Sequence, residues 1–248
     1  MMSDLFSLTG RRALVTGANT GIGQAIAVAL AGQGAHVICA GRRTCDETVD
    51  TIAAAGGSGE SLLLDFADPM AAKDVFKGAG IDILVNNAGI IRRADSVDYC
   101  EEDWDAVIDV NQKALFFTCQ AFGRELIAQG KGGAVVNIAS LLSFQGGIRV
   151  PAYTASKHAV AGITKILANE WAAKGITVNA IAPGYIATNN TEALRADEDR
   201  NAAILARIPA GRWGDPEDIG GTAAYLCSKA AKYVTGAVLN VDGGWLAR

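Results

Sequence analysis

Short apolar runs alternate with longer segments of helical spacing, and this alternation limits the possible fold more than any other feature of the sequence. The apolar runs are 12–18, 35–41, 61–66, 81–89, 133–140, 176–184 and 237–244. Most of them are continuously apolar, which is typical of strands buried on both faces. The main helical patterns are 21–34, 103–130, 153–175 and 215–228. The order predicts a doubly wound α/β fold of the Rossmann type, in which a parallel sheet of about seven strands carries helices on both faces.

We expect a single domain over residues 1–248, because the chain contains no repeat and no linker rich in Pro or Ser. Between the third and fourth runs there is room for only a short helix, 68–78. The least regular segment is 183–213, a late connection rich in Asn, Thr and charged residues. Long connections of this kind often form a lid or a wall of a substrate site, so we predict that role for it.

Composition excludes several classes of protein. The 22 Lys and Arg residues against 26 Asp and Glu residues give a net charge of −4, which argues against general binding to nucleic acid. The five cysteines show no C-x-x-C spacing and the two histidines pair with none of them, so we expect reduced thiols and no metal site. No apolar run has membrane-spanning length and the N-terminus lacks a secretion signal. We therefore expect a cytoplasmic protein without a membrane partner.

A glycine-rich turn follows the first predicted strand and opens the first predicted helix. Its sequence is T-G-A-N-T-G-I-G, residues 16–23. Glycines permit a tight turn and a close approach of the backbone, and a helix N-terminus offers unpaired N–H groups to a pyrophosphate. The fourth strand ends in N-N-A-G, residues 86–89. The predicted dinucleotide-binding residues of the two motifs are Gly17, Asn19, Thr20, Gly21, Ile22, Gly23, Asn87, Ala88 and Gly89.

The end of the second strand bears on the choice between NAD and NADP. An acidic side chain there usually binds the adenosine ribose, but this chain has Gly41 at that position, followed by Arg42. Arg42 could face a 2′-phosphate, which favours NADP, or it could stack on the adenine or face solvent. Asp65 and Phe66, after the third strand, are better placed for the adenine.

Three side chains near the fifth strand indicate proton transfer. Ser140 ends that strand, and Tyr153 and Lys157 are four residues apart on a predicted helix, so they share one face. A nearby ammonium favours the phenolate and lowers the pKa of a tyrosine. Tyr153 could then exchange a proton with a substrate oxygen while Ser140 hydrogen-bonds that same oxygen. Y-x-x-x-K alone also fits a solvated helix face.

Together, T-G-x-x-x-G-I-G, N-N-A-G, Ser140, Y-T-A-S-K and A-P-G resemble, in order and spacing, the short-chain dehydrogenase/reductase family over essentially the whole chain. The resemblance implies a catalytic set of Asn111, Ser140, Tyr153 and Lys157. It further implies that Lys157 holds the nicotinamide ribose and that Asn111 orders a water. The segment P-G-Y-I-A-T would bind the nicotinamide through Pro183, Gly184, Ile186 and Thr188. Family members are commonly homotetramers.

Further segments, among them N-N-A-G-I-I-R-R and S-F-Q-G-G-I-R-V-P, resemble family members that oxidise deoxygluconates at carbon 3 or carbon 5. Those members usually use NAD, so the cofactor is NAD or NADP, with NAD slightly favoured. A sugar acid carries a carboxylate, which arginine binds well. Arg149 is the first candidate for that contact and Arg93 the second; Gln145 and Tyr185 are candidates for hydroxyl contacts.

Other functions stay open. Within the same enzyme class, the substrate could be gluconate oxidised at carbon 5, or a 3-oxoacyl thioester, although the acidic balance offers no support for docking an acyl carrier. Some dinucleotide-binding folds act instead as redox-sensing regulators, which typically lose the Tyr or the Lys. The presence of both Tyr153 and Lys157 favours an enzyme.

Overall fold

The computed structural model describes residues 5–247, so residues 1–4 and 248 of the predicted domain lie outside it. Seven parallel strands form one sheet in the order β3-β2-β1-β4-β5-β6-β7. The strands are β1 Arg12–Thr16, β2 His36–Gly41, β3 Ser58–Leu63, β4 Ile83–Asn86, β5 Gly133–Ile138, β6 Ile176–Pro183 and β7 Val238–Val241. The strand order reverses between β1 and β4, and ligands of doubly wound sheets bind at the carboxyl ends of the strands at such a point. The predicted fold class is confirmed.

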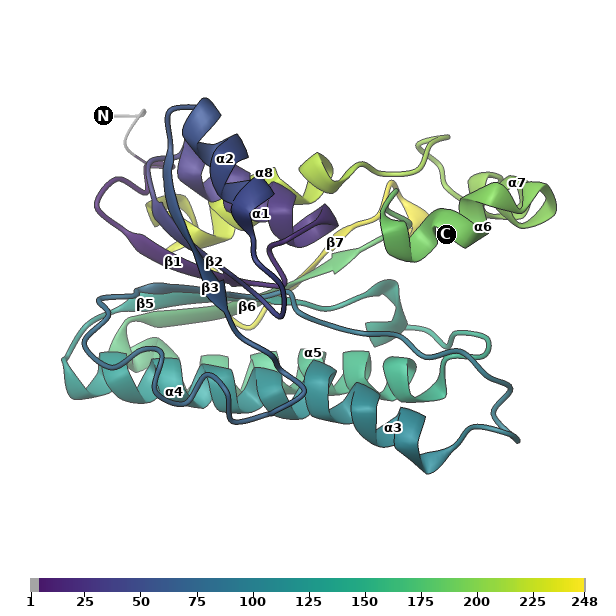
Figure 1. Ribbon diagram of the computed structural model, residues 1–248, viewed down its shortest axis with the longest axis horizontal. Helices are drawn as coiled ribbons and strands as arrows, with labels where there is room; N and C mark the ends of the chain where they lie inside the picture. The colour runs from purple at the N-terminus through teal and green to yellow at the C-terminus, as the bar shows by residue number, and fades with distance from the viewer. Residues whose placement is uncertain (1–4, 248) are drawn as a thin grey trace.

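Helices cover both faces of the sheet. They are α1 Gly21–Gly32, α2 Asp46–Ala54, α3 Glu101–Ile108, α4 Leu115–Ala128, α5 Pro151–Trp171, α6 Glu192–Ala196, α7 Glu198–Leu205 and α8 Pro216–Cys227. Figure 1 shows α1, α2 and α8 on one face and α3, α4 and α5 on the other. The helix α2 was not predicted from the sequence.

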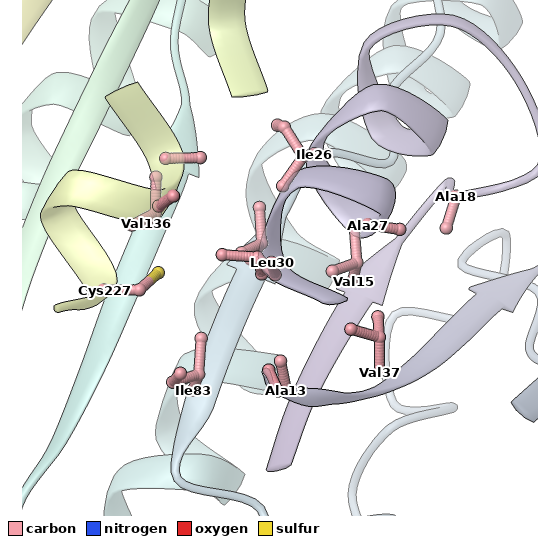
Figure 2. Packing of buried hydrophobic residues seen from close by; sticks show 14 of the residues in the cluster. Ala13, Val15, Ala18, Ile26, Ala27, Leu30, Val37, Ile83, Val136 and Cys227 are labelled. Carbon is pink, nitrogen blue, oxygen red and sulfur yellow. The ribbon is translucent and has the colours of Figure 1, made fainter. Parts of the chain in front are cut away.

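The two layers enclose two hydrophobic cores because successive side chains of a strand point to opposite faces. In β1, Ala13 and Val15 pack with Ile26 and Leu30 of α1, as Figure 2 shows. Leu14, between them, packs into the second core with residues of α4 and α5. Both faces of β1 are therefore dry, which explains its continuously apolar sequence.

The segment between β3 and β4 differs from the prediction. The expected helix 68–78 is absent, and the chain forms successive turns in which Ala71 N–H donates to Asp68 O at 3.0 Å and Lys73 N–H to Met70 O at 3.0 Å. The carboxylate of Asp68 also accepts from the backbone N–H of Met70 at 2.9 Å. Aspartate side chains that bond nearby backbone groups in this way compete with helix formation.

Two other segments also differ from the prediction: 103–130 is less regular than expected, and 183–213 is more regular. A single helix was predicted over 103–130. The structure has α3 and α4 there, joined without a break by a π-helical segment, Asp109–Ala114. The segment 183–213, predicted to be irregular, contains α6 and α7 and lies beyond the carboxyl end of β6 in Figure 1. A bridge between Ile186 and Gly214 joins its two ends. Within residues 5–247, none of the helices has the length and apolar character needed to cross a membrane.

Candidate active site

The glycine turn after β1 forms a cradle that only glycine fits. Gly17 and Gly21 have φ angles of 64° and 58°, in the left-handed region that favours glycine. A Cβ atom added at Gly23 would lie 2.2 Å from the carbonyl oxygen of Gly17 and 2.4 Å from Nδ2 of Asn87. No side chain caps the N-terminus of α1 and no acidic residue lies in its first turn. The first N–H groups of α1 are thus available to an anion, and the cradle fits the pyrophosphate of a dinucleotide.

The N-N-A-G motif at the end of β4 is bonded directly to this turn. Asn87 donates through Nδ2 to the carbonyl oxygens of Thr16 and Gly17, at 3.0 and 3.1 Å. The hydroxyl of Thr16 accepts from the backbone N–H groups of both Asn87 and Ala88, each at 2.9 Å. The structure therefore brings the two predicted nucleotide motifs together. Thr16 was absent from the predicted site; its signal was a hydroxyl residue directly before the first glycine.

The end of β2 leaves little room for a side chain at Gly41. A Cβ atom at Gly41 would lie 3.0 Å from the carbonyl oxygen of Arg43 and 3.2 Å from Sγ of Cys45. Arg42 is exposed, and its guanidinium has no hydrogen bond or ion pair with the described residues. Asp65 is exposed and accepts from the backbone N–H of Ala67 at 3.0 Å. Arg42 therefore places an unpaired positive charge directly after β2.

Tyr153 and Lys157 lie one turn apart on α5, and Nζ of Lys157 is 5.5 Å from the centre of the Tyr153 ring. Nζ donates to the carbonyl oxygen of Ile138, at the end of β5, at 2.6 Å. Burial lowers the pKa of Lys157 to about 8. The structure thus provides a buried amine that can lose its proton close to neutral pH.

The pKa of Tyr153 differs from the prediction. We expected Lys157 to lower it, whereas burial of the phenol raises it, with a hydrogen bond from Ser140 and the charge of Arg93 acting in the opposite direction. The expectation was wrong because it considered charge and not desolvation. Lys157 is itself buried and directed to a backbone carbonyl, so the same dry environment favours its neutral form.

Asn111 lies in the π-helical segment and is 1% exposed. Its Oδ1 accepts from the N–H of Ile90 at 2.8 Å, and its Nδ2 donates to the carbonyl oxygen of Ile90 at 2.9 Å and to Oγ of Ser156 at 3.3 Å. Asn111 therefore ties the chain after N-N-A-G to α5. Among the described residues, no hydrogen bond joins it to the side chain of Lys157. Isolated π-helical turns are frequent at functional sites.

The two predicted carboxylate-binding arginines have different surroundings. Nε of Arg149 lies 3.1 Å from a carboxylate oxygen of Asp95, with both side chains more than half exposed. Arg149 also has a φ of 63°, the only positive φ of a non-glycine residue in the described chain. Arg93 is exposed, forms no ion pair with the described residues, and lies near enough to Tyr153 for its charge to lower that pKa. Arg93 is thus a cation without an ion pair among the described residues, and its charge acts on the phenol.

The remaining candidates gather near the C-terminus of the chain. Oε1 of Gln145 accepts from the indole of Trp245 at 3.4 Å. The Tyr185 ring lies between those of Trp213 and Trp245, with centre distances of 5.4 and 4.7 Å. Arg207, after α7, lies 3.9 Å from the Trp245 ring centre. Pro183 ends β6, and Gly184, Ile186 and Thr188 follow it. A Cβ atom added at Gly21 would lie 3.4 Å from Cγ2 of Thr188, so this segment reaches the glycine cradle.

The glycine cradle lies where the strand order reverses, and α5 carries a partly buried tyrosine one turn from a buried lysine. Together with the serine after β5, this arrangement defines a dinucleotide-dependent oxidoreductase. Residues 17–246 match the family model described as Enoyl-(Acyl carrier protein) reductase. The chain belongs to the short-chain dehydrogenase/reductase family and is an NAD(P)-dependent oxidoreductase acting on CH–OH groups.

Several similar proteins are named for sugar acids. The chain is 57% identical to a 2-dehydro-3-deoxy-D-gluconate 5-dehydrogenase of Bacillus subtilis (strain 168), over 100% of this chain and 99% of that one. It is 43% identical to a gluconate 5-dehydrogenase of Gluconobacter oxydans (strain 621H), over 97% and 96%. It is 74% identical, with a TM-score of 0.98, to the crystal structure of a putative 2-deoxy-D-gluconate 3-dehydrogenase from Agrobacterium tumefaciens with bound NADP, over 98% and 99%.

Proposed function

We propose that this protein transfers a hydride between a nicotinamide dinucleotide and a secondary alcohol of a deoxy sugar acid. The preferred substrate is 2-dehydro-3-deoxy-D-gluconate, oxidised at carbon 5, or 2-deoxy-D-gluconate, oxidised at carbon 3. The observation that carries the proposal is the 57% identity, over the full length of both chains, to the relative of that name. The catalytic set alone would serve many alcohols.

In this proposal the chain's own residues bind, orient and move a proton. Gly17, Gly21, Gly23 and Asn87 would hold the dinucleotide, which when bound supplies or accepts the hydride. Tyr153 exchanges a proton with the substrate oxygen, and Ser140, whose hydroxyl acts to lower the pKa of Tyr153, orients that oxygen. Because burial raises the pKa of Tyr153, the neutral phenol is favoured, and it is the form that donates a proton to a ketone. Reduction should therefore be favoured at lower pH and oxidation at higher pH.

Lys157 supports the same proton transfer. A buried amine with a pKa of about 8 can take up or release a proton at working pH, so it suits a relay behind Tyr153. Asn111 would act by position, because its amide groups are bonded to Ile90 and Ser156.

We propose that the protein uses NADP as well as NAD. Because β2 ends in Gly41 and not in an acid, and the exposed Arg42 follows, the last residue of that strand offers no negative charge to repel a 2′-phosphate. The relative of known structure at 74% identity has bound NADP. Values of kcat/KM for the two cofactors should lie within about tenfold of each other, a difference of about 1.4 kcal/mol. A much larger preference for either cofactor would contradict this part of the proposal.

We assign the substrate carboxylate to Arg93. Arg149 is engaged by Asp95, whereas Arg93 is unpaired among the described residues and its charge lowers the pKa of Tyr153. Charge-assisted hydrogen bonds contribute about 1.5–3 kcal/mol, so Arg93→Ala should raise KM for the sugar acid by about 10- to 100-fold. Arg92→Ala is the matched control, because Arg92 is the adjacent residue and its own guanidinium pairs with Asp103 at 3.2 Å. Equal KM values in the two variants would remove Arg93 from the site.

A panel of sugar acids tests the function as a whole. 2-Dehydro-3-deoxy-D-gluconate, 2-deoxy-D-gluconate, gluconate and 5-ketogluconate are assayed with each cofactor by the absorbance of the reduced nicotinamide. We expect the highest kcat/KM with a deoxy sugar acid and near-complete loss of turnover in Tyr153→Phe. Gluconate is the second candidate substrate, favoured by the 43% identity to the Gluconobacter oxydans enzyme. Near-normal turnover in Tyr153→Phe would remove the proposed mechanism.

The remaining features of the proposal concern the whole chain. Residues 1–248 act as one catalytic domain, with 183–213 closing over the substrate. All five cysteines are free, which supports a reducing cytoplasmic location. The protein acts as a homotetramer, as the family resemblance implies, and sedimentation of the purified protein would test this assembly.

A further inference from the structure

Ser140 stands on a short turn and not on the sheet. It directly precedes the 3-10 turn Leu141–Ser143, and its Oγ accepts from the N–H of Leu142 at 3.2 Å. Its partner Tyr153 lies on α5, beyond the connection 144–150, much of which is exposed. The covalent chain therefore does not by itself set the position of Ser140 relative to Tyr153.

Ser143 supplies a direct link between the two elements. Its Oγ donates to the backbone carbonyl oxygen of Lys157 at 2.6 Å, and the two residues are 7% and 5% exposed. The acceptor is one helical turn beyond Tyr153. The bond thus joins the turn that follows Ser140 to the part of α5 on which Tyr153 and Lys157 stand.

The other end of the same turn is held by packing. Leu141 is 4% exposed and lies in a small hydrophobic cluster with Ile208 and Trp245. Apolar contacts of this kind hold a segment in place without setting the angle of a hydroxyl. The hydrogen bond of Ser143 is the directional contact of the turn with α5.

We propose that Ser143 is a positioning residue whose hydrogen bond to the Lys157 carbonyl holds the hydroxyl of Ser140 against Tyr153. This inference rests on the proposed function, in which Ser140 and Tyr153 handle the substrate oxygen. Ser143 touches neither the phenol nor the ammonium through any hydrogen bond in the described structure. It acts only through Ser140.

Removal of the Ser143 hydroxyl should have two linked effects. A displaced catalytic group lowers turnover, so kcat should fall between about 10- and 100-fold. The hydrogen bond from Ser140 also lowers the pKa of Tyr153, so a weaker bond should move phenol ionisation to higher pH. The KM of the dinucleotide should not change, because the glycine cradle lies on β1 and α1.

The experiment compares Ser143→Ala, Ser140→Ala and the double variant with Ser228→Ala as a matched control. Ser228 is 6% exposed and donates to a backbone carbonyl of α8, that of Tyr225, at 2.8 Å. Two quantities are measured: kcat against pH for oxidation of 2-dehydro-3-deoxy-D-gluconate by NADP, and ultraviolet titration of the phenol in the free protein, taken as the difference from Tyr153→Phe.

We expect Ser143→Ala to lower kcat and raise the midpoint of phenol ionisation, and Ser228→Ala to change neither. In the Ser140→Ala background, Ser143→Ala should change kcat by less than about twofold, because the group it positions is gone. The inference is overturned if Ser143→Ala has the same kcat and the same midpoint of phenol ionisation as Ser228→Ala while Ser140→Ala has a lowered kcat. It is equally overturned if Ser143→Ala lowers kcat to the same extent in both backgrounds with no shift in the midpoint. If Ser140→Ala and Tyr153→Phe both retain turnover, the proposed function fails instead.

Discussion

Gly23→Ala tests whether the cradle after β1 binds the dinucleotide. The added Cβ would lie 2.2 Å from the Gly17 oxygen, whereas ordinary contacts begin at 3.4 Å, so the two must separate by about 1.2 Å. Nδ2 of Asn87, at 2.4 Å from the same Cβ, would also be displaced and would lose its bonds to Thr16 and Gly17.

These contacts set the expected size of the effect. Overpacking costs about 1–3 kcal/mol and each lost hydrogen bond about 1 kcal/mol, offset by about 1 kcal/mol from replacing a helical glycine with alanine. The free energy of unfolding should fall by about 3 kcal/mol. Because the methyl group distorts the surface that would contact the pyrophosphate, dinucleotide affinity should fall by about 100-fold, equivalent to about 2.7 kcal/mol.

Titration calorimetry with NADP and NAD measures the affinity, and urea unfolding measures the stability. Gly32→Ala is the control, because it lies in the same helix and nothing stands within 4 Å of its added Cβ. That variant should bind as the unmodified protein does and be stabilised by up to about 1 kcal/mol. If Gly23→Ala matches Gly32→Ala in both measurements, the cradle is not the dinucleotide site.

Three further variants follow from the same structure. Burial lowers the pKa of Lys157 from 10.5 to about 8. Between these pH values the unfolded chain binds more protons than the folded protein, so the free energy of unfolding rises with pH, by about 3 kcal/mol in total. Urea unfolding should show this rise in the unmodified protein and not in Lys157→Met. Arg42→Ala should raise the KM of NADP and leave that of NAD unchanged, because only NADP presents a 2′-phosphate to the exposed guanidinium; equal effects on both cofactors would assign Arg42 to the adenine. Asn111→Leu should lower the free energy of unfolding by about 2–4 kcal/mol, because the N–H and C=O of Ile90 lose their partner; an unchanged unfolding curve would show that water replaces the amide.

The strand pattern predicted the sheet well because burial on both faces leaves a strong local mark. Every predicted strand overlaps an observed one, although β3 begins three residues earlier than predicted, at Ser58. The edge position explains this, since β3 pairs only with β2 and its residues are mostly exposed. Its apolar signal is accordingly weak at the start. The residues of α2 show a similarly mixed pattern, with only Thr48 and Ile52 buried.

Several features are not visible in the apolar spacing of the sequence. The prediction of a helix over 68–78 was wrong, because the side chain of Asp68 accepts a hydrogen bond from the backbone N–H of Met70 and so competes with helix formation. The π-helical segment around Asn111 is not visible in apolar spacing. The ranking of Arg149 over Arg93 came from its place between Ser140 and Tyr153 in the sequence, whereas the ion pair with Asp95 is a property of two neighbouring loops.

The sequence by itself determined the layered α/β architecture, the two glycine-containing motifs and the candidates Ser140, Tyr153 and Lys157, whereas Asn111 came only from the family resemblance. These follow from local rules: strand burial, the conformations open to glycine, and the spacing of four residues that puts Tyr153 and Lys157 on one helix face. Only the tertiary structure decided the protonation of that pair. Desolvation raises the pKa of Tyr153 and lowers that of Lys157, and it depends on everything packed around them. The link from Ser143 to the Lys157 carbonyl has the same origin, because it exists only when the turn after β5 lies against α5.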